Sequence, residues 1–377
     1  MPAKLLHIAS FIGNIGDNAS HLGLGNILNE ISTEKPEIEH LEIRKFYKNY
    51  TLADNLKFDE SFADYANTFD GIIIGGGGFL DYWVPGSGTG TTLDIPQSVI
   101  RKIKRPLIIS SVGALPHQAV PEGNEVRFKK FLDVALEQDN LFIALRNDGS
   151  FENIQENFGQ DYAERMHKIL DNAFFYSPPI RERLVEQEYV AINLAPDQLS
   201  MHSKLHAPLE VDDFYQQIKQ VIEHCISSLG LHVVLVPHIQ ADMTAILKVI
   251  QSLESFTART MVSVAPCIQG NWGAEQLLSI YQNSKFVIAT RFHANVCSTA
   301  MQKATIGIAV LDRVGFMYDS IGMNQAYVLP GEKLAEELIA KASEQSTNNK
   351  IAHSLHLHNL KTDSRLFYES KLGPILK

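Results

Sequence analysis

The chain has 377 residues, of which 45% are apolar and 20% charged, as in globular proteins long enough for two domains. Its formal net charge of −10 argues against a sequence-independent nucleic-acid binder, which needs a basic face, and we expect no nucleic-acid partner. Three widely spaced cysteines fit neither a zinc pattern nor a disulfide framework. No apolar run is long enough to span a bilayer, so we expect a cytoplasmic protein, with peripheral contact at the inner face of a membrane left open.

Apolar, strand-like runs alternate with helix-period segments through the first half of the chain. Strands are predicted at 4–9, 40–46, 71–74, 107–110 and 141–145, and helices at 18–31, 58–68 and 125–138. Continuous apolar strands separated by helices favour a parallel sheet that is covered on both faces. Pro178 and Pro179 cannot continue a regular element, and we place an interdomain linker there.

The same alternation restarts after the two prolines. Strands are predicted at 189–194, 232–236, 261–264, 286–289 and 304–311, and helices at 212–229, 243–253, 273–282, from about 293, and at 333–343. The predicted domains are therefore 1–176 and 189–350, and the tail 351–377 is expected to form a helix that leans back on the first domain. The predicted fold is α/β, with two doubly wound Rossmann-like domains that face each other across a cleft.

The segment 286–295 is the centre of the functional prediction, because a short buried strand runs directly into a helix-compatible stretch there. Ligands of open α/β sheets bind at the carboxyl ends of strands, and helix N-termini attract anions. Arg291 adds a guanidinium group, and His293 can exchange protons near neutral pH. This pattern indicates anion recognition with acid–base capacity. An Arg that satisfies helix carbonyls and a His packed in a core are equally compatible with it.

Two glycine-containing segments follow predicted strands in the first half. In Gly13-Asn14-Ile15-Gly16-Asp17-Asn18, Asp17 could orient a sugar hydroxyl group or could cap the helix that follows. The spacing is not GxGxxG, which argues against a dinucleotide site. The run Gly75 to Gly78 could form the floor of a substrate site or a tight turn, and no Gly-Lys-Ser/Thr follows it to make a phosphate-binding loop. The later stretch 86–92 is expected to be a mobile loop.

Two further cationic side chains follow predicted strands. Arg146 could clamp a carboxylate or phosphate through two hydrogen bonds, or it could pair with Asp148 and cap the next helix. His238 follows another strand, although a single His is more often structural. Since all these residues follow strands, we expect them to line one cleft that suits a small ligand carrying both phosphate and carboxylate.

A set of motifs resembles the polysaccharide pyruvyltransferase family. The motifs are Gly-Asn-Ile-Gly-Asp, Ile-Ile-Ile-Gly-Gly-Gly-Gly, Leu-Arg-Asn-Asp-x-Ser, Asp171-Asn172-Ala173-Phe174 and Arg291-Phe292-His293-Ala294. The resemblance covers roughly Leu5 to Gly322. It implies a glycosyltransferase-B-like architecture and transfer of the enolpyruvyl unit of phosphoenolpyruvate to a sugar, which gives a pyruvate ketal and phosphate in surface polysaccharide biosynthesis.

The resemblance implies donor-site roles for individual residues, and our hypothesis adds the acceptor site. His293 and Arg291 would be catalytic, and the donor would be bound by Arg146, Arg291, Phe292, His293, His238 and Arg313. The acceptor, a saccharide or lipid-linked saccharide, would be bound by Asn14, Gly16, Asp17, Gly76, Gly77, Gly78 and Asp81. Phosphoenolpyruvate is then a co-substrate, and neither a cofactor nor a metal is expected. This chain departs from the family pattern in having Asn147 after Arg146, Asn172 after Asp171, and Arg313 in place of a lysine.

Other readings remain open at this point. A nucleotide-sugar glycosyltransferase would share the fold, but no candidate carboxylate for a ribose is evident near Arg291. A non-catalytic saccharide- or anion-binding protein, or an inactive family member, would bind the donor without turnover. An NAD-dependent oxidoreductase lacks its glycine fingerprint here. The oligomeric state is also open, and a homo-oligomer is compatible with the sequence.

Overall fold

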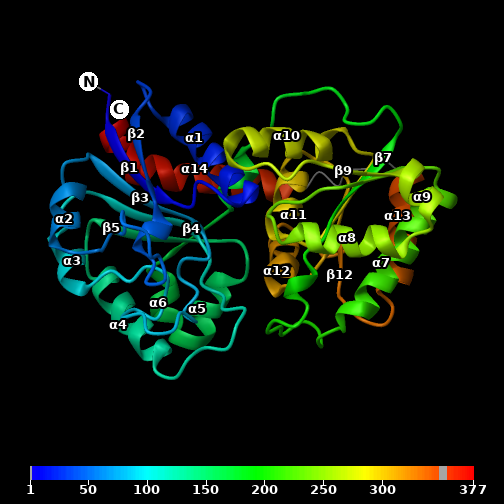
Figure 1. Ribbon diagram of the computed structural model, residues 1–377. Coiled ribbons are helices and arrows are strands. Elements are labelled where there is room, and N and C mark those ends of the chain that lie inside the picture. The colour runs from blue at the N-terminus through cyan, green and yellow to red at the C-terminus, as the bar shows by residue number, and fades with distance from the viewer. Residues whose placement is uncertain (1, 348–354) are drawn as a thin grey trace. The chain divides into compact units, whose positions relative to one another are not determined.

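The computed structural model describes residues 2–347 and 355–377 (Figure 1). The end of the predicted second domain, 348–350, and the start of the predicted tail, 351–354, lie outside the described residues. The chain forms two compact units. Unit 1 comprises Met1–Phe11, Gly23–Asn172 and His358–Lys377, and unit 2 comprises Ile12–Leu22 and Ala173–Leu357.

Unit 1 is built on a six-stranded, fully parallel sheet. Its strands are β1 (Lys4–Ala9), β2 (Glu37–Glu42), β3 (Gly71–Gly77), β4 (Leu107–Val112), β5 (Leu141–Arg146) and β6 (His167–Ile169). They lie in the order β2-β1-β3-β4-β5-β6. Every residue of β3 and β4 is buried, which explains their unbroken apolar and small-residue sequences. The order reverses between β1 and β3, and ligands bind at such a switch point in doubly wound folds.

Helices cover the faces of this sheet. They are α2 (Glu60–Ala66), α3 (Gln97–Lys102), α4 (Asn124–Leu136), α5 (Ser150–Phe158), α6 (Gln160–Glu164), the second half of α1 (Ile15–Ile31), and the C-terminal α14 (Leu355–Leu376). Figure 1 shows α14, in red, alongside this sheet. Its Tyr368 hydroxyl donates a hydrogen bond to Asn172 at 2.7 Å, and its Ser364 Oγ accepts one from the Leu170 backbone N–H at 3.0 Å.

Unit 2 contains a second parallel sheet of six strands. These are β7 (Tyr189–Asn193), β8 (His232–Leu235), β9 (Val262–Val264), β10 (Val287–Ala289), β11 (Thr305–Ile308) and β12 (Tyr327–Val328). Their order is β12-β11-β10-β7-β8-β9, which is the Rossmann order with its switch point between β7 and β10. The helices are α7 (Val211–Ser227), α8 (Asp242–Ser252), α9 (Ser255–Met261), α10 (Gly270–Asn283), α11 (Phe292–Ala300), α12 (Asp312–Ser320) and α13 (Leu334–Thr347).

The prediction of two doubly wound parallel sheets is confirmed, and each unit has a hydrophobic core of its own. The strand predicted at 40–46 is wrong in its bounds, because the observed strand begins and ends earlier. β2 ends at Glu42, whose carboxylate accepts a hydrogen bond from the Arg44 backbone N–H, and a 3₁₀ turn, η1 (Ile43–Phe46), follows. β2 is also an edge strand that pairs only with β1 within the described chain, so its sequence is largely polar.

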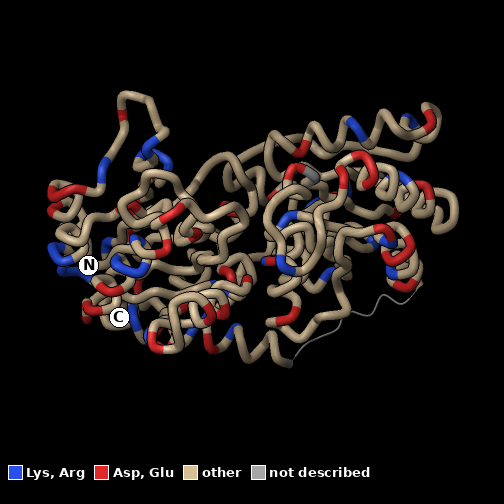
Figure 2. The backbone as a smooth tube through the Cα atoms, turned by 90° about the horizontal axis from the view of Figure 1, so that it is seen from below, with Lys and Arg blue, Asp and Glu red and all other residues tan. Residues whose placement is uncertain are grey.

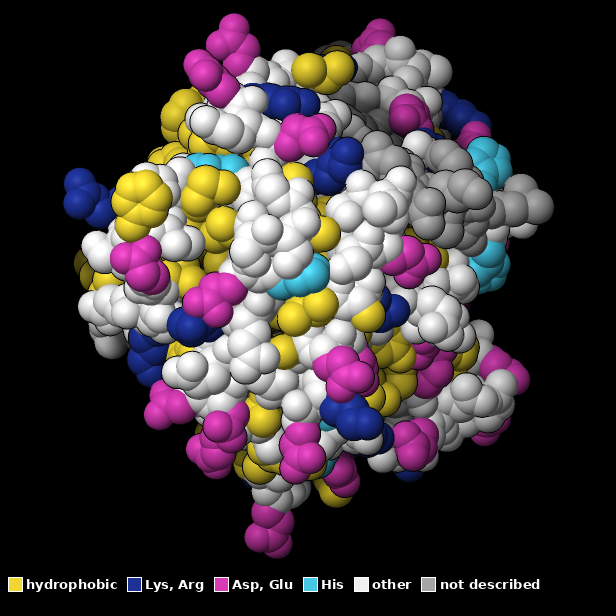
Figure 3. Space-filling view, turned by 90° about the vertical axis from the view of Figure 1, so that its right-hand side faces the viewer, with side chains coloured by type: hydrophobic (Ala, Val, Ile, Leu, Met, Phe, Trp, Pro, Cys, Tyr) yellow, Lys and Arg dark blue, Asp and Glu magenta, His cyan; other side chains and the backbone are white. Residues whose placement is uncertain are grey.

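Basic and acidic residues are interspersed along the backbone (Figure 2). On the face of unit 2 seen in Figure 3, acidic and basic side chains likewise alternate with scattered hydrophobic ones. Within the part of the chain that the structure describes, no helix combines the length and the apolar character needed to cross a membrane.

Candidate functional site

The fold fixes the segment after β10 at the switch point of unit 2. β10 lies beside β7, and the last residue of β7, Asn193, holds the chain where it leaves the sheet. The Arg291 backbone N–H donates to Asn193 Oδ1 at 3.0 Å, and the Thr290 N–H donates to the Asn193 carbonyl at 3.1 Å. Helix α11 begins directly afterwards at Phe292, with Arg291 as its N-cap residue. The first N–H groups of this helix therefore lie at the carboxyl edge of the sheet, as the sequence predicts.

The guanidinium group of Arg291 is held by a buried carboxylate. Its Nε lies 2.8 Å from both oxygens of Asp242, its Nη2 also donates to Asp242, and the side chain of Asp242 is fully buried. Nη2 is additionally 3.5 Å from Oδ1 of Asp197, which is about half exposed. Nη1 makes no hydrogen bond to any residue in the described ranges. Two carboxylates therefore lie near Arg291, although the sequence showed no clear candidate there.

Asp242 also fixes the turn after β8. It accepts hydrogen bonds from the backbone N–H groups of His238, at 2.8 Å, and Ile239, at 3.3 Å. His238 itself is fully buried, and its Nε2 lies 2.8 Å from the Tyr281 hydroxyl. Burial, with the nearby charges of Arg291 and His293, lowers the pKa of His238 well below the usual 6.5. The imidazole is therefore enclosed and has a weak tendency to take up a proton, and donor binding by His238 stays a prediction.

The first turn of α1 packs on His293. Oδ1 of Asp17 lies 3.7 Å from Nδ1 of His293, a distance typical of an ion pair but longer than a hydrogen bond. Asn14 donates from Nδ2 to Asp17 Oδ1 at 3.1 Å and accepts from the Gly16 N–H at 3.0 Å. A Cβ atom on Gly16 would lie 2.3 Å from Cβ of His293, so only glycine allows this approach.

Further hydrogen bonds secure the N-terminal segment within unit 2. The Ile15 N–H and Nε2 of Gln269 both point to the His238 carbonyl, at 3.5 and 3.1 Å. Nδ2 of Asn18 donates to Asn271 Oδ1 at 3.0 Å. Three remote parts of the sequence, 14–18, 238–242 and 291–293, therefore meet in one unit.

Two other residues of the predicted donor site belong to unit 2. Phe292 is nearly buried, and its ring meets the His293 ring edge-to-face at 5.3 Å between centroids. Arg313 is buried in the first turn of α12.

Arg146, by contrast, belongs to unit 1, where it forms a buried ion triad. Its Nε lies 2.7 Å from Asp148 Oδ2, and its Nη1 lies 3.3 Å from Asp171 Oδ2. Burial alone would lower the pKa of Arg146, but the charges of the two carboxylates outweigh it and raise this pKa. Asp148 also accepts from the Ser150 N–H at 3.3 Å, where α5 begins. The Arg–Asp pair that the sequence left open is therefore present, whereas donor binding by Arg146 stays a prediction.

The glycine run and Asp81 also lie in unit 1. Gly76 has a φ of +85°, and the Gly77 carbonyl accepts from the Gly113 N–H at 2.8 Å. Asp81 is buried, accepts from the Leu115 N–H at 2.9 Å, and lies 3.3 Å from Nδ1 of His117. Sequence reasoning missed His117, because nothing local marks the loop after β4 as a partner of Asp81.

The predicted site residues thus form two groups. Asn14, Gly16, Asp17, His238, Arg291, Phe292 and His293 meet in unit 2, which also holds Arg313, and Gly76, Gly77, Gly78, Asp81 and Arg146 lie in unit 1. Asn14, Gly16 and Asp17 were predicted to bind the acceptor, and the structure places them beside the predicted donor residue His293. The acidic partners Asp242 and Asp197 were not predicted.

Solved structures with a similar fold identify the fold type of this chain. The chain is similar to a UDP-GlcNAc 2-epimerase from Methanocaldococcus jannaschii, with a TM-score of 0.57, 10% identity, and 97% of this chain and 98% of that chain covered. A UDP-GlcNAc 2-epimerase from Neisseria meningitidis gives a TM-score of 0.56 at 10% identity, with 98% and 99% covered. Such likeness shows a glycosyltransferase-B-type fold and, at this identity, the fold alone.

No curated protein sequence matches the chain significantly. The family model described as polysaccharide pyruvyl transferase matches residues 14–312, a span that contains nearly all of the unit 2 site and the Arg146 triad. The chain therefore belongs to the polysaccharide pyruvyl transferase family.

Proposed function

We propose that the protein transfers the pyruvyl group of phosphoenolpyruvate to two hydroxyl groups of a sugar, forming a ketal and releasing phosphate. The observation that carries the proposal is the arrangement of Arg291 and His293 at the start of α11, in a chain of this family. Formation of surface polysaccharide is the corresponding biological setting.

The donor has a phosphate and a carboxylate, and the start of α11 offers groups suited to one of them. Nη1 of Arg291 is not engaged by the described residues, while Asp242 holds the rest of the guanidinium group in one orientation. The N–H groups of the first helical turn add partial positive charge. We assign one anionic end of the donor to this place. Donor binding by Arg146, which the family resemblance implies, stays a separate prediction.

His293 is the proposed proton-transfer group. The carboxylate of Asp17 lies on its Nδ1 side, and Asn14 holds that carboxylate in place. A carboxylate in this position orients an imidazole and stabilises the imidazolium form that carries the proton. Asn14 and Asp17 therefore take part in our proposal through His293.

The reaction balances without any other reactant. A proton adds to the methylene carbon of phosphoenolpyruvate, which becomes a methyl group, and the adjacent carbon develops positive charge. A first sugar hydroxyl group adds to that carbon and loses its proton. A second hydroxyl group of the same sugar then displaces the phosphate, and its proton leaves with the phosphate or to water. Acid–base catalysis and stabilisation of the anionic groups are the two contributions required of the protein.

The test is a steady-state assay of phosphate release from phosphoenolpyruvate in the presence of candidate saccharide acceptors. His293→Ala and Arg291→Ala should each lower kcat/KM by about 100-fold or more, the range for loss of a proton-transfer group or a charge-stabilising donor. His202→Ala and Arg259→Ala, at exposed positions of the same unit, should keep wild-type rates. Full activity in both site variants would refute the assignment.

A thermal-shift comparison separates the proposal from its rivals. Phosphoenolpyruvate should raise Tm, and UDP-GlcNAc at the same concentration should not. The opposite result would favour a nucleotide-sugar glycosyltransferase. Stabilisation by phosphoenolpyruvate without turnover on any acceptor would favour a binding protein.

A further inference from the structure

Unit 1 contains a cavity at the carboxyl edge of its sheet that none of the predicted site residues lines. Its volume is about 320 Å³, and it lies between the segment after β2 and the loop after β3. Both strands flank β1, so the cavity lies close to the switch point between β1 and β3. This is where doubly wound sheets bind ligands, and the volume is that of a small-molecule site.

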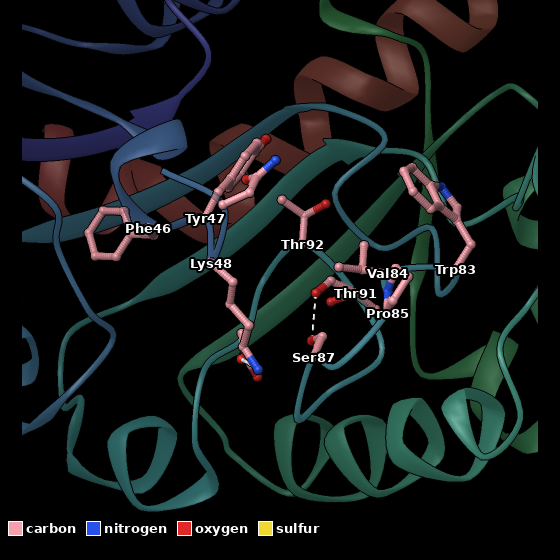
Figure 4. Close-up of a pocket in the computed structure, with 11 residues that line it drawn as sticks. Phe46, Tyr47, Lys48, Trp83, Val84, Pro85, Ser87, Thr91 and Thr92 are labelled. Atoms are coloured by element: carbon pink, nitrogen blue, oxygen red, sulfur yellow. Dashed lines mark hydrogen bonds and ion pairs between the residues drawn. The ribbon is translucent and has the colours of Figure 1, made fainter. Parts of the chain in front are cut away.

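The lining combines aromatic rings with groups that donate and accept hydrogen bonds. The residues that matter here are Tyr47, Lys48, Asn49, Trp83, Thr92 and Asp94. Figure 4 shows Tyr47 and Lys48 on one side of the cavity and Trp83 on the other. Aromatic faces suit the apolar faces of a ligand, and the amide, hydroxyl and carboxylate groups suit its hydroxyl groups.

The charges of the cavity cancel. Nζ of Lys48 lies 3.1 Å from Asp94 Oδ2 and also donates to the Gly86 carbonyl. Asp94 in turn accepts from the Gly88 N–H at 2.7 Å. A site with one paired cation and one paired anion has no surplus charge for a phosphate or carboxylate, and therefore favours an uncharged polar ligand.

The loop on the Trp83 side is held by its own hydroxyl groups. Oγ of Ser87 donates to the Thr91 carbonyl at 2.7 Å, and Oγ1 of Thr89 donates to the Leu93 carbonyl at 2.9 Å. The side chains of Ser87, Thr89 and Thr91 are all buried. The stretch 86–92, which was expected from sequence to be a mobile loop, is thus held in one conformation by internal hydrogen bonds. A preformed wall of this kind lowers the entropy cost of ligand binding.

Two neighbouring features extend the site. A second cavity of about 570 Å³ shares Phe46, Tyr47, Lys48 and Asp94 with the first, which gives room for more than one sugar unit. On another side, the Trp83 ring meets the His117 ring edge-to-face at 5.6 Å, and His117 is the partner of buried Asp81. The indole N–H of Trp83 is buried without an acceptor among the described residues, an arrangement that a ligand oxygen or water could relieve.

We propose that this cavity binds an uncharged saccharide and that it is the acceptor subsite of the enzyme, the second part of which rests on the proposed function. The neutral lining, the aromatic rings of Tyr47 and Trp83, and the place at the sheet edge together carry the assignment. It differs from the acceptor residues predicted from sequence in using the 46–49 and 83–94 segments.

The chain offers a direct probe, because its two tryptophans are Trp83 and Trp272, and Trp272 is an exposed residue of unit 2. In full-length Trp272→Phe protein, Trp83 is the only tryptophan. Its fluorescence would be titrated with methyl β-galactoside, methyl β-glucoside, methyl α-mannoside, N-acetylglucosamine and lactose. We expect at least one of these to shift the emission saturably, and lactose to bind more tightly than a monosaccharide of the same series.

Pocket variants locate the binding. In the Trp272→Phe background, Lys48→Met and Asp94→Asn should each raise Kd for the bound sugar by about tenfold, as expected for one lost charged hydrogen bond. Lys130→Met and Asp139→Asn, at exposed positions of the same unit, should leave Kd unchanged. Absence of a saturable shift with every sugar, or an equal Kd in pocket and control variants, would overturn the proposal. UDP-GlcNAc would be titrated in the same way, and a fluorescence response to it but to none of the sugars would overturn the proposal too.

Measurements of turnover distinguish the proposed acceptor subsite from the proposed pyruvyl transfer reaction. Lys48→Met should raise KM for the acceptor while KM for phosphoenolpyruvate stays unchanged. Sugar binding without phosphate release would leave the subsite standing as a saccharide site and reject the reaction. Phosphate release with unchanged acceptor KM in Lys48→Met and Asp94→Asn would support the reaction and reject this cavity as the acceptor subsite.

Discussion

Oδ1 of Asp17, at the start of the chain, lies 3.7 Å from Nδ1 of His293, at the first turn of α11. The two residues come from segments that fold into the same unit, although most of the sequence separates them. The contact gives the histidine a fixed carboxylate partner, and it connects the Gly-Asn-Ile-Gly-Asp motif to the proposed proton transfer.

Replacing Asp17 should slow the reaction without removing substrate binding. We expect Asp17→Asn to lower kcat by about 10- to 100-fold, the usual effect of losing a carboxylate that orients an active histidine. KM for phosphoenolpyruvate should change much less. The pH profile of kcat is the informative measurement. Loss of the carboxylate should shift the part of this profile that depends on proton transfer by His293, whereas loss of a purely structural contact should not. A profile identical to that of the wild type would contradict the assignment.

Gly16→Ala tests the close packing beside this pair. The new Cβ would lie 2.3 Å from Cβ of His293, so the imidazole or the helix must shift. We expect both Tm and kcat to fall. Gly25→Ala is the matched control, because Gly25 lies in the same helix with no atom within 4 Å of the added Cβ. Its stability should rise by about 0.5–1 kcal/mol, since alanine is the better helix former. Equal losses in the two variants would refute the packing argument.

In our proposal, Asp197 competes with the anionic donor for Arg291. Its carboxylate lies 3.5 Å from Nη2 and is about half exposed. Removing the charge with Asp197→Asn should lower KM for phosphoenolpyruvate by about twofold to fivefold, the size of effect expected for an exposed charge pair. The difference from wild type should shrink with added salt, because exposed charges are screened. Asp213→Asn, at an exposed position of α7, should leave KM unchanged. An increase in KM in Asp197→Asn would show that Asp197 assists the donor.

His238 makes the stability of unit 2 depend on pH. Its folded-state pKa lies well below the usual 6.5, so at acid pH the unfolded chain binds a proton that the folded chain does not. The stability is therefore complete above pH 6.5 and falls below it, by about 1.4 kcal/mol per pH unit at most. Urea unfolding followed by circular dichroism at about pH 7.5 and about pH 5.5 measures this. His238→Gln should lose less stability on acidification than the wild type, and an equal loss would contradict the prediction.

The central motif could be predicted from sequence because its information is local. A buried apolar run, then Arg291, then a helix-compatible stretch, define a strand–helix junction without reference to the rest of the chain. The two parallel sheets follow from the same kind of pattern. β2 was misplaced because an edge strand needs fewer apolar residues, and its polar first half gave no signal.

The partners of the motif were not predictable in this way. Asp242 neutralises Arg291 because the turn after β8 lies at the same sheet edge, and only the strand order brings β8 and β10 to either side of β7. Asp17 meets His293 because the first turn of α1 belongs to unit 2, and nothing in the N-terminal sequence marks that crossing between units. A carboxylate's partner depends on the final arrangement of elements, whereas its place on a strand or helix depends on its neighbours in sequence.

Arg146 requires a test that separates stability from binding. Arg146→Met leaves Asp148 and Asp171 buried without their cation, and we expect a loss of about 3–5 kcal/mol in the free energy of unfolding. Loss of activity in that variant therefore says little about the donor.

Arg146→Lys keeps the charge but loses the planar fork, so it should fold with a smaller loss of stability. If Arg146 binds the donor, Arg146→Lys should raise KM for phosphoenolpyruvate by about tenfold or more at a temperature where it is fully folded. Arg101→Met, an exposed position of α3, serves as control and should change neither quantity. A folded Arg146→Lys enzyme with wild-type KM would assign Arg146 to the structure of unit 1 alone.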